Sequence, residues 1–146
     1  MTYILAIDQG TTSTRSMIFD TEMNVITIDQ KEFKQYFPKS GWVEHDPSDL
    51  WNTTLVTCHN AIKKTGKDVE NIKAIGITNQ RETVIVWDKN SGEPDYNAIV
   101  WQDRRTADMC ELMREAGNEK LINDRTGLLL DPYFSSTKLK WILDNV

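Results

Sequence analysis

The sequence predicts an α/β fold in which helices pack on a mixed β-sheet. Three observations lead to this class: three short apolar runs joined by tight turns at the N-terminus, a long helical segment after them, and further short strands and helices in the remainder. A sheet and a helix each bury one apolar face, so such a series favours helices layered on a sheet. The 146 residues, 39% of them hydrophobic, suit one domain with a sizeable core.

The N-terminal segment is expected to form a three-stranded antiparallel meander. Its strands are predicted at residues 3–7, 16–19 and 25–28, where β-branched and aromatic residues alternate with turn residues. Residues 31–41 are expected to extend the third strand and then to form a loop.

A single helix is predicted from Pro47 to Thr65. Asp46 is a suitable N-cap, a proline favours the first helical position, and Gly66 is a plausible C-terminal stop. Apolar residues recur at helical spacing within it, namely Trp51, Leu55, Cys58 and Ile62.

The second half of the chain is predicted to contain three strands and three helices. The strands are expected at residues 72–78, 83–87 and 98–101. The first of these helices is expected to end near Gly117 and the second at Gly127. The third is expected to begin at Ser135 or Ser136, either of which could cap it. The last helix places its apolar residues on one face: Leu139, Ile142, Leu143 and Val146. The sequence ends inside this helix, so we expect it to be incomplete at its C-terminus.

Composition excludes several classes of function. The net charge of −5 argues against nucleic-acid binding, and the apolar start is too short for a membrane span or a signal peptide. Cys58 and Cys110 show no metal-ligand spacing, so we expect free thiols and a cytoplasmic protein. His45 and His59 have no nucleophile at a telling spacing and are expected to be structural.

The segment from Asp8 to Arg15 has the residue types of a phosphate-binding loop. Gly10 allows close backbone approach, while Arg15 adds a fixed cation suited to phosphate oxygens. The residues between them, Thr11, Thr12 and Ser13, bring hydroxyls beside free N–H groups. Asp8 lies where it could hold Mg²⁺, directly or through water. An ordinary β-turn explains the same residues equally well. A Walker A loop is excluded, because no lysine follows the glycine and the next segment is a predicted strand.

Polar residues at a break between two predicted strands form a second candidate site. Arg81 offers several donors and Glu82 only acceptors, so this pair could grip a polyol from both sides. On these two residues alone, a solvated surface ion pair is the more frequent arrangement.

Two aromatic residues and two arginines complete the candidates. Trp101, at the end of an apolar strand, could pack on a ligand's carbon face or belong to the core. Tyr133 could donate its hydroxyl to a ligand or pack in the interior. Arg104 and Arg105 fall at a helix start, where the dipole opposes basic residues, so one of them is expected to have a specific partner.

Five segments together resemble the glycerol kinase family of carbohydrate kinases. They occur in that family's order and spacing and cover the chain from end to end: residues 8–13, 41–47, 77–83, 101–106 and 131–135. The local difference is Thr14, where many members carry serine.

The resemblance implies the actin-like ATPase (ribonuclease H-like) fold, whose two domains close on ATP, Mg²⁺ and substrate. Residues 1–146 would then be the N-terminal glycerol- and phosphate-binding domain of an enzyme that converts glycerol to glycerol 3-phosphate. The catalytic base and the adenine pocket of such an enzyme are expected beyond Val146.

The resemblance also implies a role for each candidate. The hairpin residues Thr11, Thr12, Ser13 and Arg15 approach the phosphates of ATP, with Arg15 stabilising the transferred charge, and Asp8 lies near the metal. Glycerol is bonded by Arg81, Glu82 and Tyr133, while Trp101 packs on its carbons. A kinase for another polyol or sugar, and a non-catalytic actin-like module, remain the alternatives. The oligomeric state stays open, a homo-oligomer included.

Overall fold

The computed structural model describes residues 2–146 and resolves two compact units within them. The first unit contains the residues up to Lys34 together with Asp46–Gln80, and the second contains Gln35–His45 and Arg81–Val146. The length alone suggested one domain, whereas the chain crosses between the units three times, after Lys34, His45 and Gln80.

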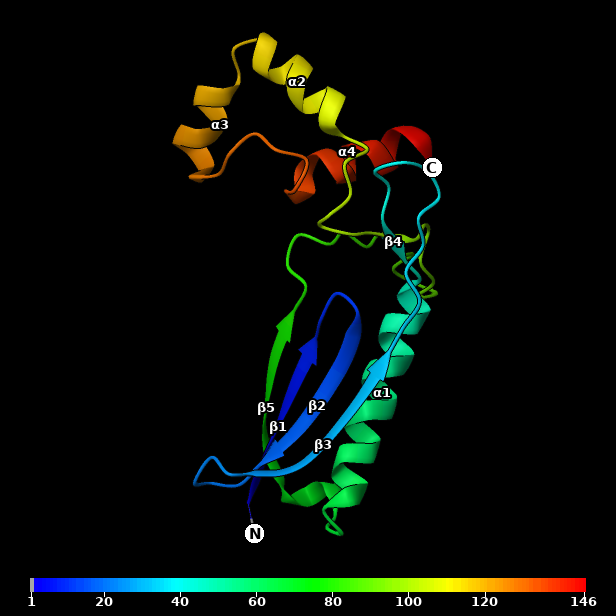
Figure 1. Cartoon of the computed structure of the whole chain (residues 1–146), viewed down its shortest axis with the longest axis vertical. Helices are drawn as coiled ribbons and strands as arrows, with labels where there is room; N and C mark the ends of the chain where they lie inside the picture. The colour runs from blue at the N-terminus through cyan, green and yellow to red at the C-terminus, as the bar shows by residue number, and fades with distance from the viewer. Residues whose placement is uncertain (1) are drawn as a thin grey trace. The chain divides into compact units, whose positions relative to one another are not determined.

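A four-stranded mixed sheet forms the first unit (Figure 1). Its strands are β1 (Tyr3–Gln9), β2 (Ser13–Phe19), β3 (Val25–Glu32) and β5 (Ile72–Asn79), in the order β3-β2-β1-β5. Neighbours among the first three strands are antiparallel, and β5 runs parallel to β1. The predicted meander is therefore confirmed, and its strands reach closer to the first turn than expected.

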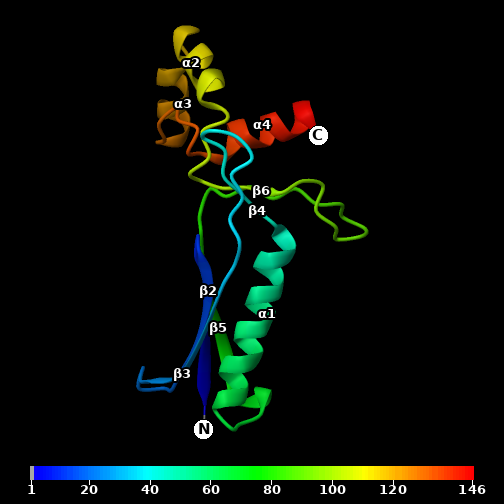
Figure 2. The same cartoon turned by 45° about the vertical axis from the view of Figure 1, so that its right-hand side comes forward.

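Helix α1 (Pro47–Lys64) lies along one face of this sheet (Figure 2). The predicted cap is confirmed, because the Asp46 side chain accepts a hydrogen bond from Ser48 N at 2.8 Å. The predicted stop is confirmed too, since Gly66 follows the C-cap residue Thr65 with φ +66°. A short 3-10 helix, Val69–Asn71, then leads into β5.

The face that α1 turns to the sheet differs from the predicted apolar stripe. Trp51 and Leu55 are exposed, and the buried positions include small polar residues. Their hydroxyls pair across the interface, Thr53 with Thr14 at 2.9 Å and Thr57 with Ser16 at 2.8 Å. Small side chains let the helix approach closely, and the hydroxyl pairs satisfy polar groups that burial would otherwise leave without partners. The apolar core beside them consists of Tyr3, Leu5, Ile18 and Ala61.

The second unit consists of a two-stranded sheet and three helices. β4 (Glu44–His45) pairs antiparallel with β6 (Ala98–Ile99), and the helices are α2 (Ala107–Glu115), α3 (Glu119–Thr126) and α4 (Ser135–Asn145). Gly127 ends α3 as predicted, with φ +71°.

The prediction of a strand at residues 83–87 is wrong. Only isolated bridges form there, from Val84 to Ile99 and from Trp87 to Pro94. Proline lacks an N–H group and cannot continue a ladder, so this segment returns as an irregular hairpin.

Two details of α4 also differ from the prediction. No serine side chain caps it, because the N-cap residue is Phe134 and the Ser135 hydroxyl bonds elsewhere. Leu139, Leu143 and Val146 are exposed, whereas Thr137, Lys138 and Ile142 are buried. The face was mispredicted because a lysine occupies its centre.

Both cysteines are free, Cys58 in α1 and the buried Cys110 in α2. None of the helices within residues 2–146 is long and apolar enough to cross a membrane.

Candidate functional site

The first candidate site is the tight turn between β1 and β2 in the first unit (Figure 1). Gly10 N donates to Ser13 O at 3.0 Å and closes the turn. A Cβ at Gly10 would lie 3.1 Å from that same oxygen, so a larger residue would have to displace the backbone. Thr12 is exposed at the tip, and Thr11 and Ser13 are half-buried. The turn therefore presents hydroxyls beside main-chain groups at the end of the sheet.

Arg15 lies in β2 and not in the loop, and a glutamine that sequence reasoning missed contacts it. Its register partner in β3 is Gln30, whose Oε1 accepts from Arg15 Nε at 3.0 Å. The Gln30 amide also donates to Ser13 Oγ at 2.9 Å. One side chain thus links the cation to a hydroxyl of the turn. The expected extension of the third strand over residues 31–41 was the sequence signal for this neighbour, and it is confirmed only in part, because β3 ends at Glu32.

Asp8 is exposed in β1 and is paired in register with Arg15 across the hairpin. Neither residue belongs to the row that includes Thr14, Ser16 and Ile18 and is buried against α1, so both lie on the other face of the sheet. Within residues 2–146, no cluster of three or more acidic, histidine or cysteine side chains could hold a metal. A lone exposed carboxylate fits Mg²⁺, which keeps several waters and takes its other ligands from substrate phosphates.

The second candidate site lies in the second unit, around Glu82. This residue adopts the left-handed backbone conformation, with φ +66°, which is uncommon for a non-glycine residue. Its Oε2 accepts two hydrogen bonds from Ser135 in α4, from Oγ at 2.6 Å and from N at 3.2 Å. No ion pair joins it to Arg81 among the described residues, and the Arg81 side chain is exposed. The alternative of a surface ion pair is therefore not what the structure shows.

Trp101 and Tyr133 form an aromatic pair in the same unit. Their ring centroids lie 5.6 Å apart at 64°, and the rings of Tyr133 and Phe134 lie 5.1 Å apart. Trp101 N donates to Thr83 Oγ1 at 3.2 Å, which ties the turn that follows β6 to the residue after Glu82. Tyr133 is 36% exposed, so it is neither buried core nor fully solvated.

Lys138 in α4 connects the segments of Glu82 and Tyr133. It was not identified from the sequence. Its side chain is fully buried, and Nζ donates to the main-chain oxygens of Glu82, at 3.4 Å, and Tyr133. Burial lowers the pKa of Lys138 to about 8, so its ammonium is still protonated at neutral pH. The only signal in the sequence was helical spacing, because Lys138 lies one turn before the buried Ile142.

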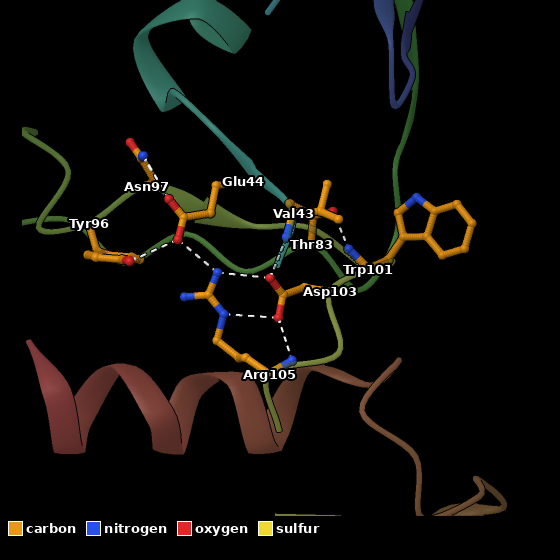
Figure 3. A network of polar contacts seen from close by, with 8 residues as sticks. All are labelled: Val43, Glu44, Thr83, Tyr96, Asn97, Trp101, Asp103 and Arg105. Carbon is orange, nitrogen blue, oxygen red and sulfur yellow. Dashed lines mark hydrogen bonds and ion pairs between the residues drawn. The ribbon is translucent and has the colours of Figure 1, made fainter. Parts of the chain in front are cut away.

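A buried charge network, centred on Arg105, supports the segment that follows Trp101 (Figure 3). The Arg105 guanidinium forms a bidentate pair with Asp103, at 2.8 and 2.9 Å, and donates to Glu44 at 2.7 Å. It also lies over the rings of Trp42 and Trp141, with its carbon 3.8 and 4.5 Å from their centroids. The specific partner expected for one of the two arginines is therefore confirmed for Arg105.

Further hydrogen bonds join the network to neighbouring segments of the second unit. Glu44 also accepts from Tyr96 and Asn97, and these hydrogen bonds, with the Arg105 charge, hold the pKa of Glu44 below its ordinary value despite burial. Asp103 accepts from Val43 N at 2.6 Å. The Trp101 indole points away from these groups, as Figure 3 shows.

The structure brings the hairpin residues together in the first unit and Glu82, Trp101 and Tyr133 together in the second, whereas Arg81 is exposed and forms no ion pair with Glu82. In the first unit the hairpin combines a cation, hydroxyls and a carboxylate, a set suited to phosphate groups and a hydrated metal. In the second unit Glu82, Trp101 and Tyr133 combine an acceptor, an apolar ring face and a phenol, a set suited to a small polyhydroxy compound.

The comparison with protein families identifies the class of protein to which this chain belongs. Residues 3–146 match the sequence model of the N-terminal domain of the FGGY family of carbohydrate kinases, so the chain belongs to that family. Its sheet and helices are accordingly those of the actin-like ATPase fold.

Among its relatives, the chain is similar to glycerol kinases. It is 68% identical over 146 residues to the glycerol kinase of Roseobacter denitrificans and 63% identical over 144 residues to that of Sinorhizobium fredii. These matches cover 100% and 99% of this chain but 30% and 29% of the two relatives, so the chain spans less than a third of their length.

Solved structures show the same likeness. The glycerol kinase of Plasmodium falciparum, determined with ADP, matches with a TM-score of 0.91 and 37% identity, over 99% of this chain and 29% of that one. A ligand-bound xylulose kinase from Lactobacillus acidophilus matches with a TM-score of 0.90 over 99% of this chain and 29% of that one. At 23% identity, this second structure shares the fold alone.

Proposed function

We propose that residues 1–146 form the N-terminal glycerol- and phosphate-binding domain of a two-domain ATP-dependent glycerol kinase, which forms glycerol 3-phosphate. The observation that carries this proposal is the meeting of Glu82, Trp101 and Tyr133 in one unit. The chain is 57–68% identical to relatives named glycerol kinase, which supports glycerol as the substrate.

Each candidate residue of the second unit has a distinct role in binding glycerol. Glu82 accepts a hydrogen bond from a hydroxyl through the oxygen that Ser135 does not use, and the exposed Arg81 donates to a neighbouring hydroxyl. Tyr133 offers its phenol to another hydroxyl, and Trp101 packs against the carbon chain. Donor and acceptor side chains with an apolar wall fix both the position and the orientation of a small polyol.

The hairpin of the first unit meets the phosphates of ATP. Thr11, Thr12 and Ser13 donate to phosphate oxygens, and Arg15 stabilises the charge that develops on the transferred group. Asp8 would hold Mg²⁺, directly or through water. When bound, Mg²⁺ neutralises phosphate charge and orients the phosphate chain. Nucleotide use is supported by the Plasmodium glycerol kinase, whose structure was determined with ADP.

The remaining parts of the active site belong to further segments of the kinase. The catalytic base and the adenine pocket lie outside residues 1–146 in this proposal. The two free cysteines support a cytoplasmic location, because a reducing compartment keeps thiols unpaired.

Calorimetry on the complete kinase with glycerol, xylulose and ATP tests this proposal. We expect glycerol to bind more tightly than xylulose, and Glu82→Ala to weaken glycerol binding by roughly 5- to 150-fold, the equivalent of ~1–3 kcal/mol for a hydroxyl left without its partner. ATP affinity should stay within about twofold. Tighter binding of xylulose would instead favour a sugar kinase, and no binding of either compound would favour a non-catalytic module.

A further inference from the structure

The start of α4 holds both polyol-binding segments of the second unit. Ser135 binds the carboxylate of Glu82 through its hydroxyl and its main-chain N–H. One turn later, Lys138 binds the main-chain oxygen of Glu82 and that of Tyr133. Two residues far apart in sequence, Glu82 and Tyr133, are therefore held by a single helical turn.

Each of these contacts restricts the movement of a group in the proposed polyol site. Both hydrogen bonds from Ser135 reach Oε2, which restrains the Glu82 carboxylate and leaves Oε1 outside this pair of hydrogen bonds. The left-handed backbone at Glu82 is a strained conformation that persists only when its surroundings hold it. Lys138 supplies such a hold at the carbonyl of the same residue.

A fully buried lysine needs a specific reason, because its charge is costly to remove from water. Asp103, Asp131 and Glu82 surround Lys138 closely enough to favour its charged form, and Cys110 is also nearby. The ammonium donates to carbonyl oxygens instead of pairing with one of these carboxylates. Its hydrogen bonds therefore fix main-chain positions.

We infer that Ser135 and Lys138 are positioning residues, which hold Glu82 and Tyr133 at the separation and orientation that a small polyol requires. The inference rests on the polyol-binding role proposed above and adds the residues that position the polyol-binding groups. Neither residue needs to touch the substrate, and both act through the two segments that do.

Matched pairs of variants on α4 test the inference in the complete kinase. Ser135→Ala is compared with Ser136→Ala, its exposed neighbour, and Lys138→Met with Lys140→Met, whose lysine is exposed and pairs with Asp144. Glycerol and ATP affinities are measured by calorimetry, and thermal unfolding is followed for each variant. We expect glycerol affinity to fall about fivefold for Ser135→Ala and roughly tenfold or more for Lys138→Met. ATP affinity and both control variants should change less than about twofold.

A double-mutant cycle separates positioning from general support of the fold. In a Glu82→Ala background, Ser135→Ala should cause no further loss of glycerol affinity, because the carboxylate that it orients is gone. An equal fivefold loss in both backgrounds would overturn the inference for Ser135. Should Lys138→Met fail to fold, the Ser135 cycle decides alone.

The two proposals fail in different ways. If the unmodified kinase binds no polyol, the proposed function is wrong. If it binds glycerol and both Ser135→Ala and Lys138→Met bind it equally well, only the positioning role is wrong.

Discussion

Arg15 illustrates, at the level of a single residue, how strand pairing prepares a side chain for chemistry. It stands in β2, with Asp8 as its register partner on one side and Gln30 on the other. The hydrogen bond from its Nε to Gln30 orients the guanidinium, and the proposed function assigns its terminal nitrogens to phosphate oxygens. A cation fixed in this way needs little rearrangement when charge develops on a substrate.

Replacing Arg15 should therefore affect catalysis more than binding of the polyol. In the complete kinase, we expect Arg15→Ala to lower kcat by about 10²-fold or more, as for other groups that meet developing charge. Glycerol affinity, measured by calorimetry, should change less than about twofold, because the polyol contacts belong to the second unit. An unchanged kcat would show that Arg15 is structural.

Burial distinguishes the two histidines. His45 in β4 is fully buried, and burial lowers its pKa from 6.5 to about 4, whereas His59 in α1 is exposed. Above pH 6.5 both folded and unfolded chains hold His45 neutral, so it adds no pH dependence. Between pH 6.5 and 4 only the unfolded chain binds the proton, so the free energy of unfolding falls as pH falls.

We expect His45 to make the chain less stable by about 3 kcal/mol over that interval, at about 1.36 kcal/mol per pH unit. Urea unfolding at several pH values between 7 and 4 measures this slope. His59→Gln should retain the slope, and His45→Gln, if folded, should reduce it. An identical slope in His45→Gln would assign the acid sensitivity to other groups, Glu44 being the first to examine.

Among the elements, α1 shows that capping and close packing matter more than an apolar stripe. The helix begins at a carboxylate that accepts from Ser48 N and ends at a glycine with positive φ. Between these ends, threonine hydroxyls meet hydroxyls of β2. The stability of the first unit thus depends on local polar bonds as well as on its apolar core.

The contribution of the cap can be measured directly. Asp46→Ala removes the acceptor at the start of α1 and should destabilise the chain by about 1 kcal/mol, seen as a lower midpoint in urea. Asp46→Asn keeps an acceptor oxygen and should stay within about 0.5 kcal/mol of the unmodified chain. Equal losses in both variants would show that charge at the helix start, not the hydrogen bond, carries the effect.

Taken as a whole, the molecule divides its candidate chemistry between two compact units. The phosphate-type hairpin belongs to one, and the polyol-type cluster belongs to the other. The relatives that it matches are more than three times as long as this chain. The proposed function places the catalytic base outside residues 1–146.

Residues 1–146 expressed by themselves should therefore show no appreciable kinase turnover. A coupled assay with glycerol, ATP and Mg²⁺ measures this, with circular dichroism to establish that the chain is folded. Turnover at the ~1–100 s⁻¹ of ordinary kinases would contradict the expectation and would place a complete active site within these residues.

Elements whose signals are local could be predicted from the amino-acid sequence alone. The meander, the capped helix α1 and the Gly127 stop followed from apolar alternation, an Asp-Pro start and glycines at helix ends, because these depend on neighbouring residues. The residue types of the candidate sites could be predicted in the same way. A hydroxyl-rich glycine turn and the neighbouring Arg81 and Glu82 can be recognised in the sequence without knowledge of the fold.

The partners of these residues, by contrast, were settled by tertiary packing. Residues 83–87 failed as a strand because their pairing segment contains Pro94, and Glu82 bonds Ser135 rather than Arg81 because α4 packs beside it. Local signals placed Gln30 near a strand and Lys138 in a helix but did not indicate their roles, which arise from strand register and from burial. Hydrogen bonds between residues distant in sequence depend on how elements pack, and packing is a property of the folded chain rather than of any one segment.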